Sequence, residues 1–494
     1  MVVQSARSLA RSLVARLVAE GARNTHEWTD HKAQLLEAFD SSGLTALFMD
    51  PHQGGFIEGP KNLALALVAF ELAWVDAGAA TCSLATNLAL APIHERGTPE
   101  QRDYYMSSCV PPQPGEDRQV MRGAFALTEP LPYVGVGTNT LVGKLRVAEW
   151  EEGKEPILQV DKRGRFITGM DFANFATCAV DTGDPRIKTS CIVIVEDTDE
   201  GVFDRGAPTL KMVHQLSSTR DPVFNVKVPA SRIVGGYTVK DGVIVPNYTH
   251  AEIIGAVFHR TRVPVALMTT AKLLSAVEPV IRYQRQRYRG GDAQPGTPKY
   301  DLGIQQKQDA VLRLAEIWAM GEAGASLGFA TARLFDQLDP SEKQKDRIFA
   351  EQGITGPKSQ LSALRKIEKL ALEYIALESK PESERDAARF AELQADPLVS
   401  YTLLESLANI LCPACKLWNT GQGATVMRES LALMGGYGIT EDCPGFLFHK
   451  WTDAQLEATY EGPEAVQRRH LSITMTNEVF LARLRIWIEE FAAL

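Results

Sequence analysis

The chain has 494 residues, of which 45% are apolar and 23% charged, so it is long enough for several domains with a substantial core. Its formal net charge of -9 argues against nucleic acid as a partner, because phosphate binding needs a clustered positive surface. No uninterrupted apolar run approaches the roughly 18 residues of a transmembrane helix, so we expect no membrane insertion. Seven cysteines indicate a reducing compartment, and the lone CxxC of Cys412 and Cys415 has no second pair, so we expect no metal.

The first twenty residues allow two interpretations. They are rich in arginine and contain no acid before Glu20, which is typical of a mitochondrial targeting helix. Leu9, Leu13 and Leu17 also fall at helical spacing, as in a first structural helix. We favour the structural helix and expect a cytoplasmic protein.

The rest of the chain changes character twice. The Ala- and Leu-rich stretch 63–97 suits buried helices, whereas short β-branched runs bounded by turn residues predict strands from about 120 to 250. Apolar residues then recur at helical spacing, and a charged stretch with glycine breakers indicates an insertion of exposed helix and loop. We predict an α+β protein, mostly α, with an N-terminal helical domain (1–118), a middle β domain (119–250) and a C-terminal helical bundle domain (251–494) that carries the insertion (about 340–395).

Four stretches have the composition of a ligand site, although each alone also suits an ordinary turn, helix face or cap. Segments 124–130 and 165–177 place a small hydroxyl or an aromatic ring at predicted strand ends, where a planar heterocycle could be hydrogen-bonded. Segment 283–291 is rich in arginine, whose guanidinium matches a pyrophosphate. Segment 431–442 places two glycines after a helical run, which fits a C-cap or a close approach to a ligand.

A fifth stretch, 458–469, places Glu461 directly before Gly462. Such a carboxylate can neighbour a helix N-cap, or it can be a base held against a ligand that needs close backbone approach. The sequence contains neither the GxGxxG nor the GxxxxGK[ST] fingerprint. A nucleotide cofactor would therefore be held by another architecture.

Taken in order, these segments resemble the acyl-CoA dehydrogenase family of FAD-dependent flavoproteins. GTPEQRDYY (97–105) is similar to a turn of the family's N-terminal domain, and FNVKVPASRIVGG (224–236) to its exit from the β domain. The segment 261–287 is similar to a family helix that begins at Arg262 and ends at Arg287, the arginine that reaches the flavin pyrophosphate of a neighbouring subunit. MGGYGIT and YEGPEAVQR complete the series.

The resemblance implies a β-barrel-like middle domain and a C-terminal four-helix bundle. It further implies FAD as cofactor, an acyl-CoA substrate, an electron-transfer flavoprotein as acceptor and a homotetramer built as a dimer of dimers. The residues that it assigns to the cofactor are Phe125, Leu127, Thr128, Phe166, Ile167, Thr168, Arg287, Gln308, Gly435, Gly436 and Pro463. Those that it assigns to the substrate are Phe258, His259, Arg262, Thr138 and Gly462.

By the same resemblance Glu461 is the base that removes the proton at Cα of the thioester while hydride leaves Cβ for the flavin. The physical requirement is clear, because a thioester α-proton is too weakly acidic for a carboxylate in water. Burial would raise the pKa of the base, and hydrogen bonds to the thioester oxygen would stabilise the enolate. Some relatives draw the base from the loop before the long helix; here we expect that loop at FHRTR (258–262), which contains no acid.

The sequence departs from the family at the CoA contacts. After TEP the usual Gly-x-Gly-Ser-Asp is replaced by LPYVGVGTNT (131–140), so the pantetheine contact is lost or supplied by Thr138. His259 replaces an Asp near the CoA adenine, Pro463 replaces a Thr that would face the flavin diphosphate, and 452–454 reads TDA for Arg-Asp-Ala. We therefore expect an acyl group of cyclic or otherwise atypical structure.

Three alternatives stay open. An acyl-CoA oxidase shares the base and the flavin but admits oxygen, and an enoyl-CoA reductase runs the reaction backwards. A flavoprotein of this fold can also become a non-catalytic binding module when it loses the base, which Glu461 argues against. A nitroalkane-oxidising relative would be expected to carry Asp at position 461.

Overall fold

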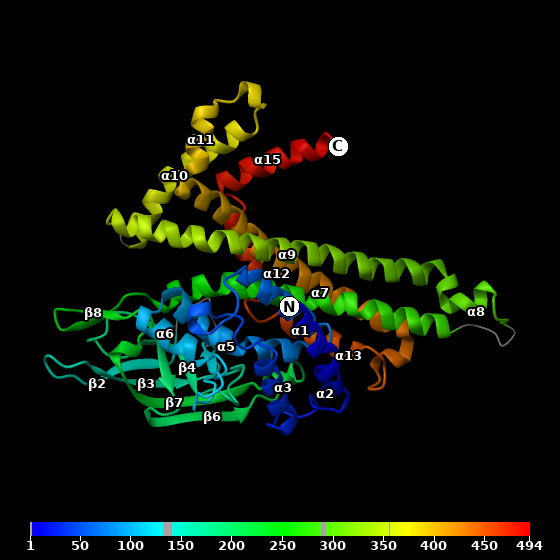
Figure 1. The fold of residues 1–494 in the computed structure, drawn as a ribbon, viewed down its shortest axis with the longest axis horizontal. Helices are drawn as coiled ribbons and strands as arrows, with labels where there is room; N and C mark the ends of the chain where they lie inside the picture. Colours follow the sequence, from blue (N-terminus) through cyan, green and yellow to red (C-terminus); the bar gives the residue numbers. More distant parts are fainter. Residues whose placement is uncertain (1, 132–140, 288–292, 355) are drawn as a thin grey trace.

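The computed structural model describes residues 2–131, 141–287, 293–354 and 356–494. Helices come first in the chain and gather beside the sheet region (Figure 1). The arginine-rich N-terminus is a helical part of the fold. One face of it is fully buried in the core of the N-terminal helices, through Ala6, Ala10, Val14 and Leu17. The elements are α1 (Val2–Leu9), a π-helical turn (Ala10–Val14), α2 (Ala15–Ala19), α3 (Asp30–Ser41), a 3-10 turn (Pro51–Gln53), α4 (Lys61–Ala73), α5 (Ala77–Arg96) and α6 (Pro99–Ser108).

Strands follow and form a seven-stranded sheet in the order β1-β4-β2-β3-β7-β6, with β5 paired to β4. Strands β8 and β9 form a separate hairpin. Alternating burial along β3 and β7 shows that one face of these strands meets the core, whereas β4 and β5 are buried almost throughout. The strands are β1 (Gly123–Ala126), β2 (Lys144–Glu149), β3 (Ile157–Arg163), β4 (Phe175–Thr182), β5 (Cys191–Glu196), β6 (Glu200–Pro208), β7 (Arg220–Pro229), β8 (Tyr237–Lys240) and β9 (Val243–Pro246), with 3-10 turns at Gln215–Ser217 and Ala230–Arg232.

The second helical part is built on three long helices that pack against one another, α7, α9 and α12, with α14 alongside α12. The protein is thus mostly helical with a curled sheet in the middle, as the sequence predicted. The remaining elements are α7 (His250–Gln286), α8 (Pro298–Leu302), a 3-10 turn (Gly303–Gln306), α9 (Gln308–Glu351), α10 (Pro357–Glu378), a 3-10 turn (Glu382–Glu384), α11 (Ala387–Ala395), α12 (Pro397–Met434), a 3-10 turn (Gly435–Ile439), α13 (Leu447–Glu457), α14 (Glu464–Thr474) and α15 (Glu478–Ala492).

Helix α7 begins twelve residues earlier than the sequence indicated, at His250 rather than at Arg262. Thr249 caps it and forms a capping box with Glu252, so the segment 258–262 is helical and not a loop. The expectation of a loop was wrong because the first turns of α7 do not face the helical bundle. Their apolar residues, among them Ile253, pack into the core shared by the sheet and α5.

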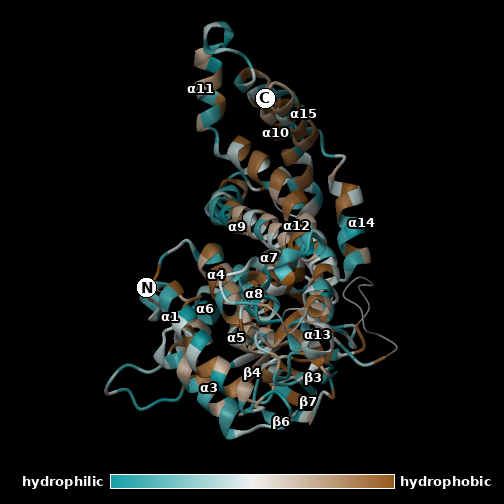
Figure 2. Ribbon diagram, turned by 90° about the vertical axis from the view of Figure 1, so that its right-hand side faces the viewer, coloured by the Kyte–Doolittle hydropathy of each residue, from teal (hydrophilic) through white to brown (hydrophobic). Residues whose placement is uncertain are grey.

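The expected insertion is more structured than an exposed helix and loop. Residues 340–351 continue α9, and α10 and α11 project beyond the body together with α15 (Figures 1 and 2). Ala371, Ile375 and Leu393 are buried in a small core of their own, to which α12 and α15 contribute Val399 and Val479. The sequence pattern missed this core because α15, which closes it, lies about a hundred residues away in the chain.

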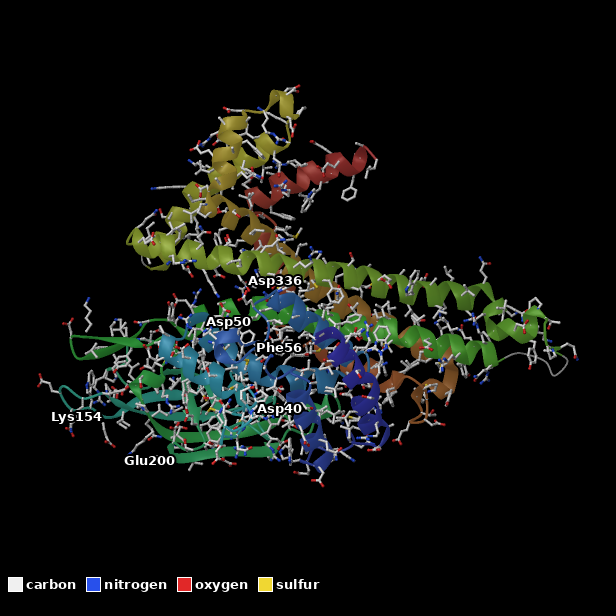
Figure 3. The ribbon with its side chains drawn as sticks, in the orientation of Figure 1. Asp40, Asp50, Phe56, Lys154, Glu200 and Asp336 are labelled. Atoms are coloured by element: carbon white, nitrogen blue, oxygen red, sulfur yellow. The ribbon has the colours of Figure 1, made fainter. Side chains whose placement is uncertain are left out.

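Side chains from distant parts of the chain join the N-terminal helices to the bundle. Asp336 of α9 accepts hydrogen bonds from the backbone N–H groups of Asn62 and Leu63, at 2.8 and 3.0 Å, and so caps α4 (Figure 3). Helices α7 and α12 are each long and apolar enough to span a membrane by length and hydropathy alone, but 67% of the apolar window of α7 is buried in the protein, as in a core helix.

Candidate active site

Glu461 lies in a strained turn between two helices. Helix α13 ends at Glu457 and α14 begins at Glu464, and in the turn Glu461 has a positive φ of 57° and Gly462 one of 91°. A left-handed conformation costs a non-glycine residue about 1 kcal/mol or more, so the surrounding structure must hold it. Glycine is favoured at position 462 by this positive φ, and a Cβ there would also lie 2.7 Å from Nε2 of Gln467, which would have to shift.

The Glu461 carboxylate is half-buried, and a hydroxyl of α7 donates a hydrogen bond to it. Oγ1 of Thr261, on α7, donates to Oε2 of Glu461 at 2.6 Å. Burial raises the pKa of Glu461, and the Thr261 hydrogen bond and the charges of Arg262 and Lys416 offset part of that rise. A carboxyl whose pKa is raised by burial has the property required of a general base.

The peptide of Glu461 is fixed by side chains of two other helices. Nε of Arg262 on α7 donates to the Glu461 carbonyl at 3.2 Å, and Nε2 of Gln467 on α14 donates to the same oxygen at 3.1 Å. Gln467 also donates to the Gly462 carbonyl at 2.9 Å. Among the described residues no acceptor lies within hydrogen-bond distance of the Glu461 N–H. The turn therefore presents one carboxylate and one free N–H.

The strand-end segments 125–128 and 166–168 lie next to each other. The N–H of Arg165 donates to the Thr128 carbonyl at 2.9 Å. The hydroxyls of Thr128 and Thr168 have no hydrogen-bond partner within the part of the chain that the structure describes. These two hydroxyls can therefore serve a ligand with polar edges.

Not every expected side chain in these segments is available. Phe125, Leu127 and Ile167 are buried in hydrophobic cores, so they could meet a ligand only through their backbone. Phe166 has a φ of 61° and is 46% exposed, and the Arg165 guanidinium lies 4.7 Å from the centroid of its ring. Glu129 of the TEP motif points inward, where it forms an ion pair with buried Lys162 at 2.9 Å.

A chain of contacts connects these segments to the turn that carries Glu461. The N–H of Gly169 donates to the Ser217 carbonyl at 3.0 Å, and the hydroxyl of Ser217 donates to the His214 carbonyl at 2.6 Å. The His214 ring lies 5.8 Å from the ring of Tyr460 in a T-shaped contact. The segment 214–217 therefore contacts both Gly169, which follows 166–168, and Tyr460, which precedes Glu461.

Arg287 and the Gly435–Gly436 pair gather at the other end of the bundle. Nη1 of Arg287 donates to the Tyr283 hydroxyl at 2.8 Å, and the Tyr283 ring lies 5.8 Å from that of Tyr437. Gly435 is the C-cap of α12, with a φ of 61°, and no atom lies within 4 Å of a Cβ built on it or on Gly436. Arg287 is exposed, and so is Gln308 at the start of α9.

This second group is far from Glu461. Thr261 and Arg287 are 26 positions apart on one helix, which corresponds to about 39 Å at a rise of about 1.5 Å per residue. The structure therefore divides the expected cofactor residues into two sets that one protomer cannot bring to one small ligand.

The expected substrate residues have mixed outcomes. Arg262 contacts the Glu461 peptide and also lies 3.3 Å from Nδ1 of His470, measured from Nη1. Pro463 is exposed and is the N-cap of α14, where its carbonyl accepts from the next turn. Phe258 and His259 lie in α7, but their side chains are outside the described part, and Thr138 is outside the described residues.

Two stretches of the chain match a known family. Residues 1–110 match the acyl-CoA dehydrogenase N-terminal domain, and residues 390–475 match the acyl-CoA dehydrogenase C-terminal domain. The chain matches the acyl-CoA dehydrogenase family in both of these domains. The turn with Glu461 falls inside the second matched stretch.

Solved structures agree on the fold. Butyryl-CoA dehydrogenase from Megasphaera elsdenii superposes with a TM-score of 0.62 at 20% identity, covering 96% of this chain and 97% of that one. An acyl-CoA dehydrogenase complexed with FAD from Bacillus anthracis gives 0.66 at 18% identity, covering 98% and 67%. Podospora anserina nitroalkane oxidase gives 0.64 at 16%, covering 97% and 95%. No curated protein sequence matches the chain.

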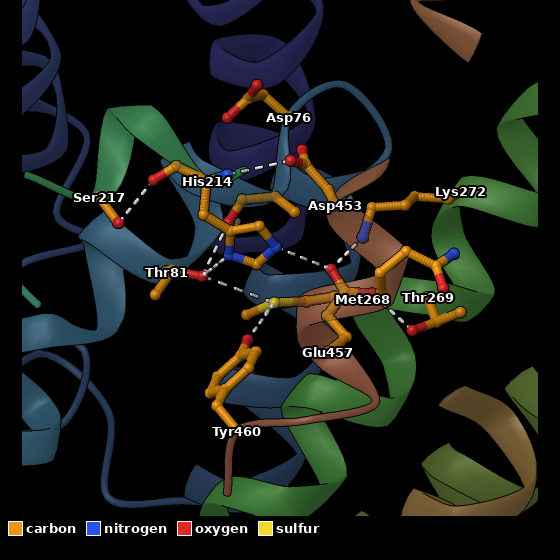
Figure 4. Close-up of polar contacts among 12 residues, drawn as sticks. Asp76, Thr81, His214, Ser217, Met268, Thr269, Lys272, Asp453, Glu457 and Tyr460 are labelled. Atoms are coloured by element: carbon orange, nitrogen blue, oxygen red, sulfur yellow. Dashed lines mark hydrogen bonds and ion pairs between the residues drawn. The ribbon is translucent and has the colours of Figure 1, made fainter. Parts of the chain in front are cut away.

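A buried ionic cluster, which no sequence motif indicated, lies beside the turn that follows α13 (Figure 4). Nη1 and Nη2 of Arg23 pair with Asp76 at 2.7 Å and with Asp453 at 3.0 Å. Nε2 of His214 lies 3.3 Å from Oε1 of Glu457, which also pairs with Lys272. The cluster ties the N-terminal helices, the sheet region and α13 together.

Charge pairing decides the protonation of this cluster. Burial alone would raise the pKa of Asp453, but Arg23, His214 and Lys272 hold it well below its ordinary value. Burial would likewise raise the pKa of Glu457, and Lys272 and His214 hold it low. The partners lie too far apart in sequence for any local motif to reveal them.

Replacing Arg23 by Met should strongly destabilise the protein. The change leaves the Asp76 and Asp453 carboxylates buried without their cation, which costs about 3–5 kcal/mol when one partner of a buried pair is removed. Urea denaturation measures the free energy of unfolding. In the matched control Arg282→Gln, an exposed pair with Glu278 is lost, and we expect a change of less than about 0.5 kcal/mol.

Proposed function

We propose that this protein is an FAD-dependent acyl-CoA dehydrogenase that introduces an α,β double bond into an acyl-CoA thioester. The single observation that supports this best is the turn at Glu461, which offers a half-buried carboxylate and a backbone N–H that has no acceptor among the described residues. A base and an oxyanion donor on one residue are what removal of an α-proton from a thioester requires.

The strand-end segments fit a flavin. The hydroxyls of Thr128 and Thr168, which have no hydrogen-bond partner among the described residues, can bond the polar edge of an isoalloxazine ring, and the exposed Phe166 ring can lie against its face. At the other end of the bundle, exposed Arg287 can pair with a pyrophosphate, and Gly435 and Gly436 leave open space for it. The isoalloxazine ring of FAD, bound beside Thr128 and Thr168, would accept the hydride that leaves Cβ of the substrate.

In the reaction the Glu461 carboxylate takes the proton from Cα of the substrate. The backbone N–H of Glu461 donates to the thioester oxygen, where negative charge develops. Thr261 orients the carboxylate through the 2.6 Å hydrogen bond, and Arg262 fixes the peptide that carries it. Burial strengthens these interactions because water competes less for the same groups.

Two copies of the chain are needed to complete one cofactor site. The Arg287 group and the Glu461 group lie about 39 Å apart along α7 at a rise of about 1.5 Å per residue. We therefore propose a homo-oligomer, a tetramer built as a dimer of dimers, in which Arg287 of one copy serves the flavin beside Glu461 of another. An electron-transfer flavoprotein is the proposed acceptor, and the cytoplasm is the proposed compartment.

Anaerobic reduction of the flavin tests the proposed function. The purified protein should be yellow, and a panel of linear, branched, cyclic and aromatic acyl-CoAs should include one that bleaches the flavin absorbance. Admission of oxygen then separates a dehydrogenase, whose flavin reoxidises slowly, from an oxidase. A protein that cannot be reconstituted with FAD, or whose flavin no acyl-CoA bleaches while a nitroalkane does, would contradict the proposal.

The rate of flavin reduction should fall as the pH decreases through the raised pKa of Glu461, because only the ionised carboxylate accepts a proton. Thr261→Val removes a hydrogen bond that lowers this pKa, so the acid limb should move to higher pH. Stopped-flow measurement of flavin reduction across a pH series gives the acid limb of the wild type and of Thr261→Val. An acid limb that stays in place in Thr261→Val would show that the hydroxyl does not support the ionised base.

A further inference from the structure

Helix α13 ends in an unusual way. Its last residue is Glu457, whose carbonyl would accept the N–H of Glu461 if the helix continued by one turn. That carbonyl accepts instead from Nζ of Lys416, on α12, at 2.6 Å. The same ammonium lies 3.5 Å from the Gly462 carbonyl, on the far side of the base.

Lys416 therefore connects the two ends of the turn that carries Glu461. It is 1% exposed, and its Nζ meets the backbone both before and after Glu461. The Glu457 carbonyl accepts from the ammonium and not from Glu461, whose left-handed φ turns the chain out of the helix, and the Glu461 N–H has no acceptor among the described residues. A cation on the last carbonyls of a helix is also favoured by the helix dipole.

We propose that Lys416 is a positioning residue for the reaction: it ends α13 at Glu457, frees the Glu461 N–H for the thioester oxygen, and supplies a positive charge that keeps the Glu461 carboxylate ionised. The inference rests on the proposed function for the identity of the ligand. Lys416 itself touches neither substrate nor cofactor in this account.

The charges around Lys416 agree with this role. Burial lowers the pKa of Lys416 to about 8, against the opposing effect of Glu461 and Glu457, so the side chain is mainly an ammonium at neutral pH. In turn Lys416 lowers the pKa of Glu461, which burial raises. The titratable groups that face it are Glu457, Glu461 and Glu464, with Arg262 and the thiols of Cys412 and Cys415.

The first test uses Lys416→Met and Lys416→Arg in the full-length holoenzyme. In Lys416→Met the turn loses the ammonium and its contacts to the carbonyls of Glu457 and Gly462. Displacement of a reacting group by about 1 Å can cost about 10²-fold in rate. We expect flavin reduction by an acyl-CoA to slow by roughly 10- to 10²-fold, with the acid limb at higher pH than in wild type. Lys416→Arg keeps the cation and should restore the position of the acid limb.

The wild type carries a second signature. Its flavin reduction should lose rate above a pH of about 8, as Lys416 becomes neutral. That alkaline limb should be absent in Lys416→Arg, because arginine does not deprotonate in this range. A wild-type rate that is flat from neutral to strongly alkaline pH would overturn the proposal, and this measurement does not depend on whether Lys416→Met folds.

An infrared titration separates this inference from the proposed function. The carboxyl signal of Glu461, identified by its loss in Glu461→Gln, can be followed with pH in the absence of any substrate. It should titrate at higher pH in Lys416→Met than in wild type. If it does so while no acyl-CoA reduces the flavin, the proposed function fails and the role of Lys416 stands; the reverse outcome overturns only the role of Lys416.

Lys345→Met is the matched control. Lys345 is also buried, pairs with Asp346 at 2.9 Å and lies over the Tyr401 ring at 4.8 Å, on the part of α9 remote from the turn. Its loss should lower stability without moving either limb of the pH profile. A merely structural role for Lys416 would give the same pattern, with reduced stability and unchanged limbs, and that result would contradict the proposal.

Discussion

Glu461→Gln should bind acyl-CoA and perturb the flavin spectrum but reduce the flavin at least about 10²- to 10⁴-fold more slowly than wild type, the contribution of a positioned general base. Glutamine is nearly isosteric with glutamate, keeps the free N–H beside the turn and can still accept from Thr261. It lacks only the capacity to take a proton. Stopped-flow absorbance under anaerobic conditions measures the rate.

Glu464→Gln is the internal control for that change. Glu464 is the first residue of α14, is partly exposed, and pairs with Arg468 on the next turn at 2.8 Å. Loss of such a pair is worth only about 0.3–0.5 kcal/mol. Reduction at nearly the wild-type rate is expected. Were Glu461→Gln to reduce as fast as Glu464→Gln, the base would lie elsewhere.

Arg287→Ala should bind FAD more weakly, with an expected loss of about 1.5–3 kcal/mol for a charge-assisted bond to the pyrophosphate. The ratio of flavin to protein absorbance after gel filtration measures the occupancy. Arg287 is exposed, and its hydrogen bond among the described residues goes to Tyr283, so its removal should leave the fold intact.

Arg282→Ala provides the comparison on the same helix. Arg282 is exposed and paired with Glu278 one turn earlier, away from the Tyr283 and Tyr437 rings that accompany Arg287. Its flavin content should equal that of wild type. If the Arg287→Ala protein were a monodisperse monomer with the flavin content of wild type, both the shared cofactor site and the oligomer would be contradicted.

Local sequence was sufficient where a short segment carries its own signal. Glu461 could be singled out because the Gly462 beside it marks a turn, and the structure shows both residues with positive φ. The change from helix to strand and back followed from β-branched runs bounded by turn residues and from the helical spacing of apolar residues. Thr128 follows the end of β1 as expected, whereas Thr168 follows the isolated bridge residue Ile167 and not the end of a strand.

Other features could not be predicted because they depend on partners distant in the chain. Arg23 and Asp453 are 430 positions apart, and nothing near either residue indicates that both are buried. The start of α7 was missed because Ile253 packs against the sheet region rather than the bundle. Lys416 has no motif of its own; its role appears only when α12 is placed against the end of α13.

The central claim is that Glu461 removes the α-proton of a bound thioester. It is tested most directly by incubating the oxidised enzyme in D2O with an acyl-CoA analogue whose β position cannot release hydride, and following the α-hydrogens by NMR. We predict that wild type exchanges the α-hydrogens for deuterium, Glu464→Gln exchanges them at a similar rate, and Glu461→Gln leaves them unexchanged. Exchange by Glu461→Gln at the wild-type rate would contradict the claim.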